Sequence, residues 1–332
     1  MENSVRMNEK LRLALIGVGH VAQQQIAALA ASEYWSLVAA ADIRPERQCL
    51  LPPGVVFLDS AEALLEAVDA DLILVATPNK THFDIGRIVL AHGANLLLEK
   101  PCCSTADELN ELLKLASKGG CFFAVALHAR HALDVRWFLQ HHLELELPTD
   151  GITRFECKFF DPYIRESSLS VGARSLGGSW FDSGINALSV VASLIPAATI
   201  SVASGRFVPS GLDGCADSAA DVDFVYSLPG GLGTGNISTS WTTGINSKTT
   251  RLIFERQGAE ILLDHSNETV VITRLGSPRK VIDLRNSQPR LVNHYVGVLN
   301  RAREMFRTRE TNIDLAVSIH KLLFDGIALS GG

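Results

Sequence analysis

The sequence lacks the basic excess of a nucleic-acid-binding protein and the long apolar run of a membrane protein. Its 30 Lys and Arg are outnumbered by 36 Asp and Glu, which gives a net charge of −6, and no basic stripe is present. The polar start "MENSVRMNEK" precedes only a short apolar run, so neither a signal peptide nor a membrane span is predicted. We expect a cytoplasmic protein without a nucleic-acid or membrane partner.

The cysteine pattern is equally poor in signals for metal sites or disulfide bonds. No two of the six cysteines form C-x-x-C, and no Cys/His cluster has the spacing of zinc ligands. We expect reduced, mostly buried thiols and no bound metal.

The first 128 of the 332 residues alternate between apolar runs and helical patterns. The runs do not alternate with polar residues, so they are typical of strands covered on both faces. Strand–helix–strand repetition predicts a parallel, doubly wound sheet with right-handed crossovers. The apolar runs are 11–18, 36–42, 72–78, 95–101 and 122–128, and the helical patterns are 21–31, 81–93 and 106–117.

The rest of the chain, 129–332, has a different pattern, most clearly after about residue 150. One helical run covers 182–194, and short, often alternating stretches separated by turn residues fill 199–284. These stretches predict an open, mainly antiparallel sheet. Helical patterns follow at 291–307 and 313–329, and the last helix could pack back on the first domain. The fold class is therefore α/β, with two domains.

The first apolar run ends in "GVGHVA", which fits G-x-G-x-x-[GA] at Gly17, Gly19 and Ala22. The first glycine permits a tight turn, the second lets the backbone approach a pyrophosphate, and the small third residue lets the helix pack on the strand. His20 and Val21 would begin the helix whose N-terminus faces the phosphates. The motif predicts a dinucleotide cofactor.

The choice between NAD and NADP depends on the end of the second run. Asp42 lies 20 residues after Ala22, where a carboxylate would bind the adenosine ribose hydroxyls and repel a 2′-phosphate. We therefore expect NAD. Arg44 leaves NADP open, because it could pair with such a phosphate, and its alternative is a solvated loop cation.

The third run is followed by "ATPNKTHFDIG", which places Thr77, Pro78 and Asn79 at the carboxyl end of a strand, the expected rim of the cofactor site. His82 is either a helix-cap or loop histidine or a neighbour of the cofactor.

The fourth run ends in "LLLEKP", Glu99-Lys100-Pro101. A glutamate and a lysine that end an apolar strand are not explained by stability. Lys100 can move a proton if burial and a positive nicotinamide destabilise its ammonium form. The alternative for Lys100 is a surface lysine at a strand end, and Pro101 is a candidate for a cis peptide bond.

These segments, together with "GGSWFDSGIN" (177–186), resemble the Gfo/Idh/MocA oxidoreductases. The resemblance implies an N-terminal Rossmann domain over 1–128 and a C-terminal α/β domain over 129–332 that binds substrate and forms a homodimer or homotetramer through its open sheet. It also implies hydride transfer between NAD or NADP and a sugar, a cyclitol or a derivative. The family's E-K-P lysine falls on Lys100, and Glu99 is expected beside the cofactor.

One departure from the family is informative. The common D-x-G-x-H-x-x-D pattern reads Asp182, Gly184, Asn186 and Ser189 here, so an asparagine replaces the usual acid–base histidine. The stretch is similar to the branch of L-arabinose and D-galactose 1-dehydrogenases, as is "LHARHA" (127–132), whose Arg130 is an expected cofactor contact. The segment "FECKFFDPYIRESS" (155–168) matches poorly, and its Glu156 and Asp161 are interpreted as strand or loop carboxylates.

The expected catalytic residues are Lys100, Asp182 and Asn186. Asn186 would hold a sugar hydroxyl, since an amide donates and accepts without exchanging protons. Asp182 would orient Lys100 or accept a substrate hydroxyl, unless it merely caps the helix. Lys100 would take the hydroxyl proton. The leading function is an aldose 1-dehydrogenase. A dehydrogenase or ketoreductase of a secondary alcohol and a catalytically silent NAD-binding regulator remain open.

Overall fold

The computed structural model describes residues 10–329, which form two compact units. Within this range, the first unit comprises the chain up to Cys103 together with 107–126 and 295–313. The second comprises 104–106, 127–294 and the chain from Asp314 onward. No helix among these residues is long and apolar enough to cross a membrane.

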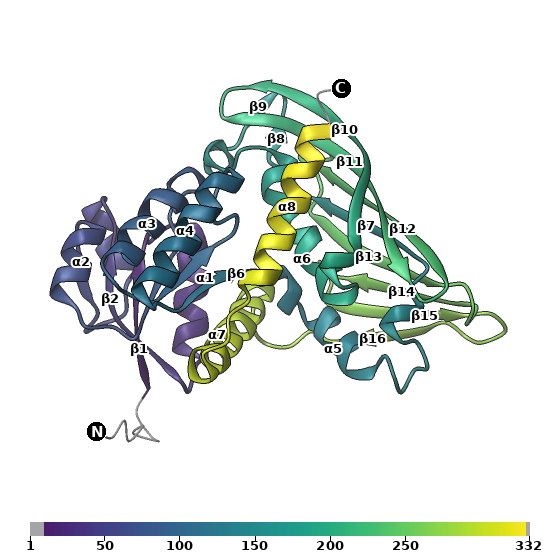
Figure 1. Ribbon diagram of the computed structural model, residues 1–332, viewed down its shortest axis with the longest axis horizontal. Coiled ribbons are helices and arrows are strands. Elements are labelled where there is room, and N and C mark those ends of the chain that lie inside the picture. Colours follow the sequence, from purple (N-terminus) through teal and green to yellow (C-terminus); the bar gives the residue numbers. More distant parts are fainter. Residues whose placement is uncertain (1–9, 330–332) are drawn as a thin grey trace. The chain divides into compact units, whose positions relative to one another are not determined.

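The first unit is a Rossmann-type domain around a six-stranded parallel sheet of order β3-β2-β1-β4-β5-β6 (Figure 1). The predicted parallel sheet is confirmed, and its order reverses between β1 and β4. Ligands of such sheets bind at the carboxyl ends of the strands where the order reverses. The strands are β1 Leu11–Ile16, β2 Trp35–Ala41, β3 Val56–Leu58, β4 Leu72–Val75, β5 Leu96–Glu99 and β6 Phe123–Ala126.

The helices of this sheet follow the strands closely in sequence. They are α1 His20–Ala30, α2 Ala61–Ala67, α3 His82–Ala91 and α4 Ala106–Gly119. Strand β3 and helix α2 were not predicted from the sequence. Three half-buried or exposed residues make β3, too few to show as an apolar run, and only tertiary pairing with β2 marks it as a strand.

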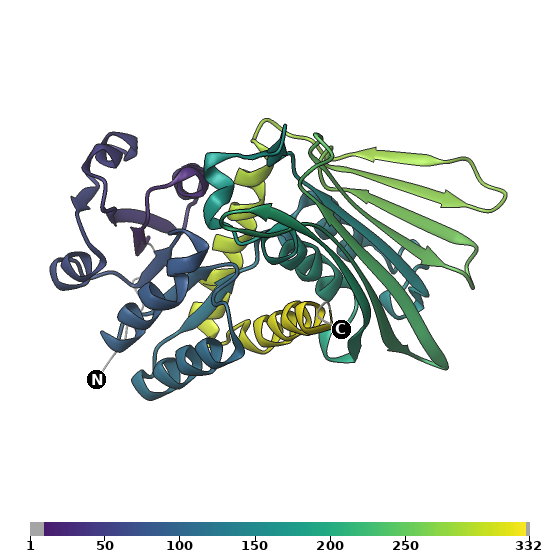
Figure 2. The ribbon, with the colours of Figure 1, turned by 90° about the horizontal axis from the view of Figure 1, so that it is seen from above.

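The second unit is built on an eight-stranded sheet of order β10-β11-β12-β7-β13-β14-β15-β16, whose strands lie side by side in Figure 2. All pairs are antiparallel except β12 with β7, so the predicted mainly antiparallel sheet is confirmed. Helix α6 (Ile185–Leu194) packs on β7, and α5 (Leu133–His141) packs on β14 and β15. The opposite ends of the sheet are the edge strands β10 and β16.

The strand bounds of this sheet are β7 Arg154–Phe160, β10 Ile200–Leu212, β11 Cys215–Leu228, β12 Gly231–Ser240, β13 Ser247–Phe254, β14 Ala259–Asp264, β15 Thr269–Arg274 and β16 Lys280–Asp283. A separate pair joins β8 (Ile164–Arg165) to β9 (Ser168–Leu169). The central strand β7 was not predicted, although Phe155, Cys157 and Phe159 alternate on its buried face. Its charged residues between them obscured the pattern.

Two long helices end the chain. Helix α7 (Arg290–Thr308) begins in the second unit and continues into the first, where Leu299 accepts a hydrogen bond from the indole of Trp35. Helix α8 (Ile313–Leu329) lies almost wholly in the second unit, where Leu323 accepts a hydrogen bond from Trp180.

Candidate active site

The glycine loop after β1 has the geometry that a dinucleotide phosphate requires. Gly17 has φ +92°, and a Cβ at this position would lie 2.7 Å from the Ala76 carbonyl oxygen, so no side chain fits. Gly19 is the N-cap residue of α1, and a Cβ built on it would meet no atom within 4 Å. His20 and Val21 form the first turn of α1, which contains no acidic residue. The loop thus leaves room for an anion at the helix N-terminus.

Asp42 lies at the carboxyl end of β2, buried against this loop. Its Oδ2 accepts a hydrogen bond from the Val18 amide at 2.8 Å. Its Oδ1 accepts from the Arg44 amide at 3.0 Å and from the Arg44 guanidinium at 3.3 Å. Asp42 therefore holds the glycine loop in place, and the half-exposed Arg44 is paired with it rather than freely solvated. Oδ2 accepts only one hydrogen bond from the described residues and keeps a further lone pair for a ribose hydroxyl.

The loop after β4 contains Thr77, Pro78 and Asn79, as predicted for the rim of the sheet. The buried Thr77 hydroxyl has no hydrogen-bond partner within residues 10–329, which marks a polar group available to a ligand. His82 begins α3, and its two ring nitrogens each lie 2.7 Å from a carbonyl oxygen, one of Thr77 and one of Pro101. Burial lowers the pKa of His82, and a neutral ring has one N–H to donate. His82 thus lies between the two loops at this edge and donates to one of them.

Lys100 directly follows β5 and is buried, at 9% exposure, and the Lys100–Pro101 bond is cis. Beside it, Glu99 Oε1 accepts hydrogen bonds from Gln25 of α1 at 2.8 Å and from the Tyr295 hydroxyl of α7 at 2.7 Å. Burial raises the pKa of Glu99, and these donors and Lys100 oppose the shift. Glu99 thus fixes the end of β5 against two helices. Gln25 and Tyr295 were missed by sequence reasoning, because nothing local connects them to Glu99.

In the second unit, the glycine pair of "GGSWFDSGIN" is explained by Asp217 of β11. Gly178 has φ +141°, and a Cβ there would lie 2.4 Å from Asp217 Oδ1. The close approach lets Asp217 Oδ2 accept from the Ser179 hydroxyl at 2.5 Å and from the Trp180 amide at 2.9 Å. A carboxylate from another strand thus caps the helical segment. Sequence reasoning did not identify Asp217.

The segment that follows differs from the single α-helix predicted from Asp182. Residues Trp180–Gly184 form a π-helix, and α6 begins only at Ile185. Asp182 lies inside the π-helix, and the N-cap residues of the two helical segments are Ser179 and Gly184, so the interpretation of Asp182 as a helix cap is wrong. Short π-helical segments occur often at functional sites.

Asn186 is the least satisfied polar side chain of this segment. It is 8% exposed, and its Nδ2 donates to the Asp182 carbonyl at 3.2 Å. Its Oδ1 has no partner within the described range. A buried acceptor without a partner is costly, so this atom favours a ligand that brings a donor, such as a hydroxyl.

A polar cluster surrounds Asp161, which follows β7. Asp161 Oδ1 lies 2.5 Å from the Lys248 ammonium, and Oδ2 accepts from the Ser183 hydroxyl at 2.9 Å. Trp241 donates to Ser183 at 3.1 Å. Burial lowers the pKa of Lys248, and the Asp161 charge opposes this. Asp161 is therefore more than the strand or loop carboxylate that was predicted, because it holds buried groups from two elements, Lys248 of β13 and Ser183 of the π-helix.

Two other predicted residues lie away from this cluster. Glu156 is on the opposite face of β7, where Arg251 pairs with both Glu156 and Glu260. Arg130 lies in the second unit, in the 3-10 turn His128–His131. A role for Arg130 at the cofactor remains a prediction.

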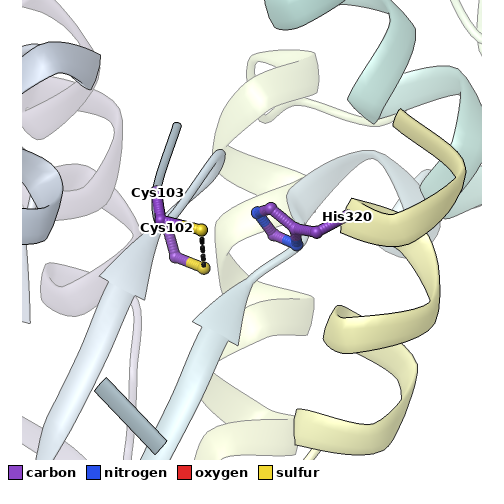
Figure 3. A group of neighbouring side chains, drawn as sticks. All are labelled: Cys102, Cys103 and His320. Carbon is purple, nitrogen blue, oxygen red and sulfur yellow. Dashed lines mark hydrogen bonds between the residues drawn. The ribbon is translucent and has the colours of Figure 1, made fainter. Parts of the chain in front are cut away.

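All six cysteines lie in the described part of the chain, and none forms a disulfide. Cys102 and Cys103 are buried directly after the cis proline, and their sulfur atoms are hydrogen-bonded at 3.8 Å (Figure 3). Burial raises the pKa of Cys102. His320, drawn in the same figure, belongs to the second unit and lies with its Nδ1 2.7 Å from the Ala316 carbonyl.

Comparison with known proteins identifies the first unit. Residues 11–127 match the model of the GFO_IDH_MocA oxidoreductase family, NAD-binding Rossmann fold. The first unit therefore matches the NAD-binding domain of this family. The match covers the glycine loop, Asp42, the Thr77 loop and Lys100. In this structure, all of these lie at the carboxyl ends of the strands of the parallel sheet.

The curated relatives that the chain resembles include sugar dehydrogenases. The chain is 32% identical to D-glucoside 3-dehydrogenase of Escherichia coli (strain K12) over 141 residues, 40% of this chain and 39% of that protein. It is 29% identical to galactose 1-dehydrogenase of Pseudomonas fluorescens over 194 residues, 57% of this chain and 58% of that protein. The chain thus spans less than two thirds of the length of each of these relatives.

A solved structure extends the similarity of fold to the whole chain. An oxidoreductase from Agrobacterium radiobacter, crystallised with NAD+, L-tartaric acid and magnesium, has a TM-score of 0.78 over 98% of this chain and 97% of its own. Its sequence identity is 15%, so the likeness concerns the fold.

Proposed function

We propose that this chain is an NAD-dependent dehydrogenase that oxidises an aldose at its anomeric carbon and releases the lactone. The similarity to galactose 1-dehydrogenase supports the substrate class, because it extends over more of the chain than the family's cofactor domain does. The glycine loop and the carboxylate of Asp42, whose charge disfavours a 2′-phosphate, support NAD.

The observation that carries the proposal is the buried Oδ1 of Asn186, which accepts no hydrogen bond in the described structure. A sugar hydroxyl supplies the donor that this atom lacks. Asn186 itself cannot exchange a proton, so it positions the hydroxyl and does not act as an acid or base. Asp182, 6% exposed and one turn earlier, adds a carboxylate that accepts from a second hydroxyl.

Lys100 is the proposed proton acceptor. Oxidation at the anomeric carbon removes the hydroxyl proton and the C–H hydrogen as hydride, and the C–O bond becomes a carbonyl. Bound NAD supplies the hydride acceptor. Lys100 in its neutral form takes the hydroxyl proton, and its position is fixed because Glu99 is anchored by Gln25 and Tyr295.

The test is an assay of the purified chain with NAD and with NADP on a panel of free aldoses and their methyl glycosides. A 1-dehydrogenase oxidises the free sugar and not its methyl glycoside, because the glycoside has no anomeric hydroxyl. Lactone is then detected as the product by trapping with hydroxylamine. Oxidation of methyl glycosides at the same rate as free sugars would contradict the proposal.

A second candidate is oxidation of a ring secondary alcohol, and the similarity to D-glucoside 3-dehydrogenase favours it. The same panel separates the two, because a 3-dehydrogenase accepts the methyl glycoside and gives a keto sugar. Cofactor binding without oxidation of any sugar or cyclitol would instead favour a regulatory role.

We also propose that the chain forms a homodimer or homotetramer through the open face of its eight-stranded sheet. That face carries partly exposed apolar side chains, Val225, Ile253 and Leu262, among paired charges such as Arg251 and Glu260. Light scattering coupled to size-exclusion chromatography measures the assembly. Ile253→Glu is expected to shift it to monomer, and a monomeric parent would refute the proposal.

A further inference from the structure

Arg290 is a half-buried cation beside the polar cluster of the second unit. It is the first residue of α7, and the start of this helix is anchored by Asn293, which donates to Glu268 Oε1 at 3.2 Å. The Arg290 guanidinium makes no hydrogen bond with any residue in the range 10–329. Five N–H donors are thus available on a side chain that has lost much of its water.

The carboxylates near Arg290 are each engaged by another group. Asp161 is paired with Lys248 and accepts from Ser183. Glu268 accepts from Asn293. The charges of Asp161 and Glu268 stabilise the guanidinium, and burial nevertheless lowers the pKa of Arg290. The protein therefore keeps a cation here without giving it a hydrogen-bonded counterion.

A third carboxylate, Asp134, also contributes to the field at Arg290. It lies in α5, and its Oδ2 is 2.6 Å from Nδ1 of His265. Like the other two, it acts on Arg290 at a distance and leaves the guanidinium donors open.

Arg290 belongs to the same neighbourhood as the proposed sugar site. The charges of Asp182 and Arg290 both act on the Tyr163 hydroxyl, which makes no hydrogen bond within the described residues. Burial, with Asp182 and Asp161, raises the pKa of Tyr163, so its hydroxyl stays protonated. Arg290 and Lys248 also repel each other, and an anion between them would relieve this repulsion.

We propose that Arg290 binds the carboxylate of the substrate, so that the enzyme acts on an acidic sugar of the uronate class in preference to a neutral aldose. This inference rests on the proposed function. A carboxylate accepts two parallel hydrogen bonds from one guanidinium and neutralises its charge. A neutral hydroxyl satisfies one donor and leaves the half-buried cation without an opposite charge bonded to it. The Tyr163 hydroxyl is a further donor to the same group.

The experiment compares matched sugars that differ only at C6: D-galactose with D-galacturonate, and D-glucose with D-glucuronate. The variants are Arg290→Met and Arg290→Lys, with Arg307→Met as control, because Arg307 is an exposed arginine of the same helix. In the parent, kcat/KM should be at least about tenfold higher for one acid than for its neutral sugar. Arg290→Met should lower the value for that acid about 10- to 100-fold, the range for losing a hydrogen-bonded charge, and for the neutral sugar less than about threefold.

Arg290→Lys should fall between the parent and Arg290→Met, because lysine keeps the charge and loses the two-pronged geometry. Binding of the same sugars is measured in parallel by calorimetry, so that the result does not depend on turnover. Arg290-dependent binding of a uronate without oxidation would sink the proposed function and keep the inference. Oxidation of neutral aldoses with no preference for either uronate, or an equal loss for acid and neutral sugar in Arg290→Met, would overturn the inference alone.

Discussion

Replacing Asn186 by leucine should make the protein at least as stable and much less active. The change removes a buried acceptor that has no partner in the described structure, which relieves about 1–3 kcal/mol, and it loses the 3.2 Å hydrogen bond to the Asp182 carbonyl, worth about 1 kcal/mol. Leucine has the same number of side-chain heavy atoms and the same branching as asparagine, so no cavity is left. The free energy of unfolding should therefore stay equal or rise by about 1–2 kcal/mol.

The same substitution removes the group that is proposed to hold a substrate hydroxyl. Loss of one buried hydrogen bond of about 1–3 kcal/mol lowers kcat/KM about 5- to 150-fold on the best sugar. The pH dependence of turnover should not change, because an amide does not titrate. Opposite changes in stability and activity are the expected signature of a residue that is kept for binding.

The assay combines urea unfolding followed by fluorescence with initial rates of NADH formation. Ser193→Ala is the matched control, because the Ser193 hydroxyl lies in the same helix and only bonds the Ser189 carbonyl at 2.8 Å. It should change neither quantity by much. If Asn186→Leu destabilises the fold by more than about 1 kcal/mol and leaves kcat/KM at the parent value, Asn186 is structural, and the proposed sugar site loses its main support.

The remaining predictions concern the cofactor domain, the proton acceptor and acid stability. Lys100→Met should lower kcat about 10²-fold, the scale of a positioned proton acceptor, and leave the KM for NAD near the parent value. The control Lys118→Met, at an exposed lysine, should leave kcat near the parent value. A normal kcat in Lys100→Met would make the lysine structural. Asp42→Asn, which keeps an acceptor for the Val18 amide, should shift the ratio of kcat/KM values toward NADP, and an unchanged ratio would show that Arg44 or another group sets the preference. His320 is buried with its pKa lowered to about 4, below the value of 6.5 for an exposed histidine, so the unfolded chain binds the extra proton and stability is lost as pH falls below about 6.5. The loss from this group between pH 8 and pH 5 is about 2 kcal/mol, so His320→Gln should lose that much less on acidification than the parent, and an equal loss in both would show that other groups cause it.

The cofactor domain could be predicted well from the sequence. Its strands are short apolar runs, its helices have their own periodicity, and the glycine loop is set by backbone geometry that neighbouring residues determine. Gly17 illustrates this, because its positive φ follows from the turn itself. Lys100 and the cis bond to Pro101 were also within reach, since an E-K-P sequence at the end of an apolar strand is a local feature.

The chemistry of the second unit depended on contacts between residues far apart in the chain. Asp217 bonds Ser179, which lies 38 residues earlier in the chain, and so caps the segment that contains Asp182. Asp161 bonds Lys248, which lies 87 residues later. No local pattern encodes such pairs, because strand order and register decide which side chains meet across a sheet. The same reason explains why the central strand β7 and the π-helix at Trp180–Gly184 were missed.

The sequence by itself thus determined the class of fold, the cofactor loop and the two residue types at 182 and 186, because these follow from local periodicity, turn geometry and side-chain chemistry. Only the tertiary structure decided which polar groups are left without partners. Asn186 and Arg290 are an ordinary amide and an ordinary guanidinium in the sequence. Burial makes the unsatisfied oxygen of Asn186 costly, and the half-buried guanidinium of Arg290 keeps its donors open, so a ligand is expected at each.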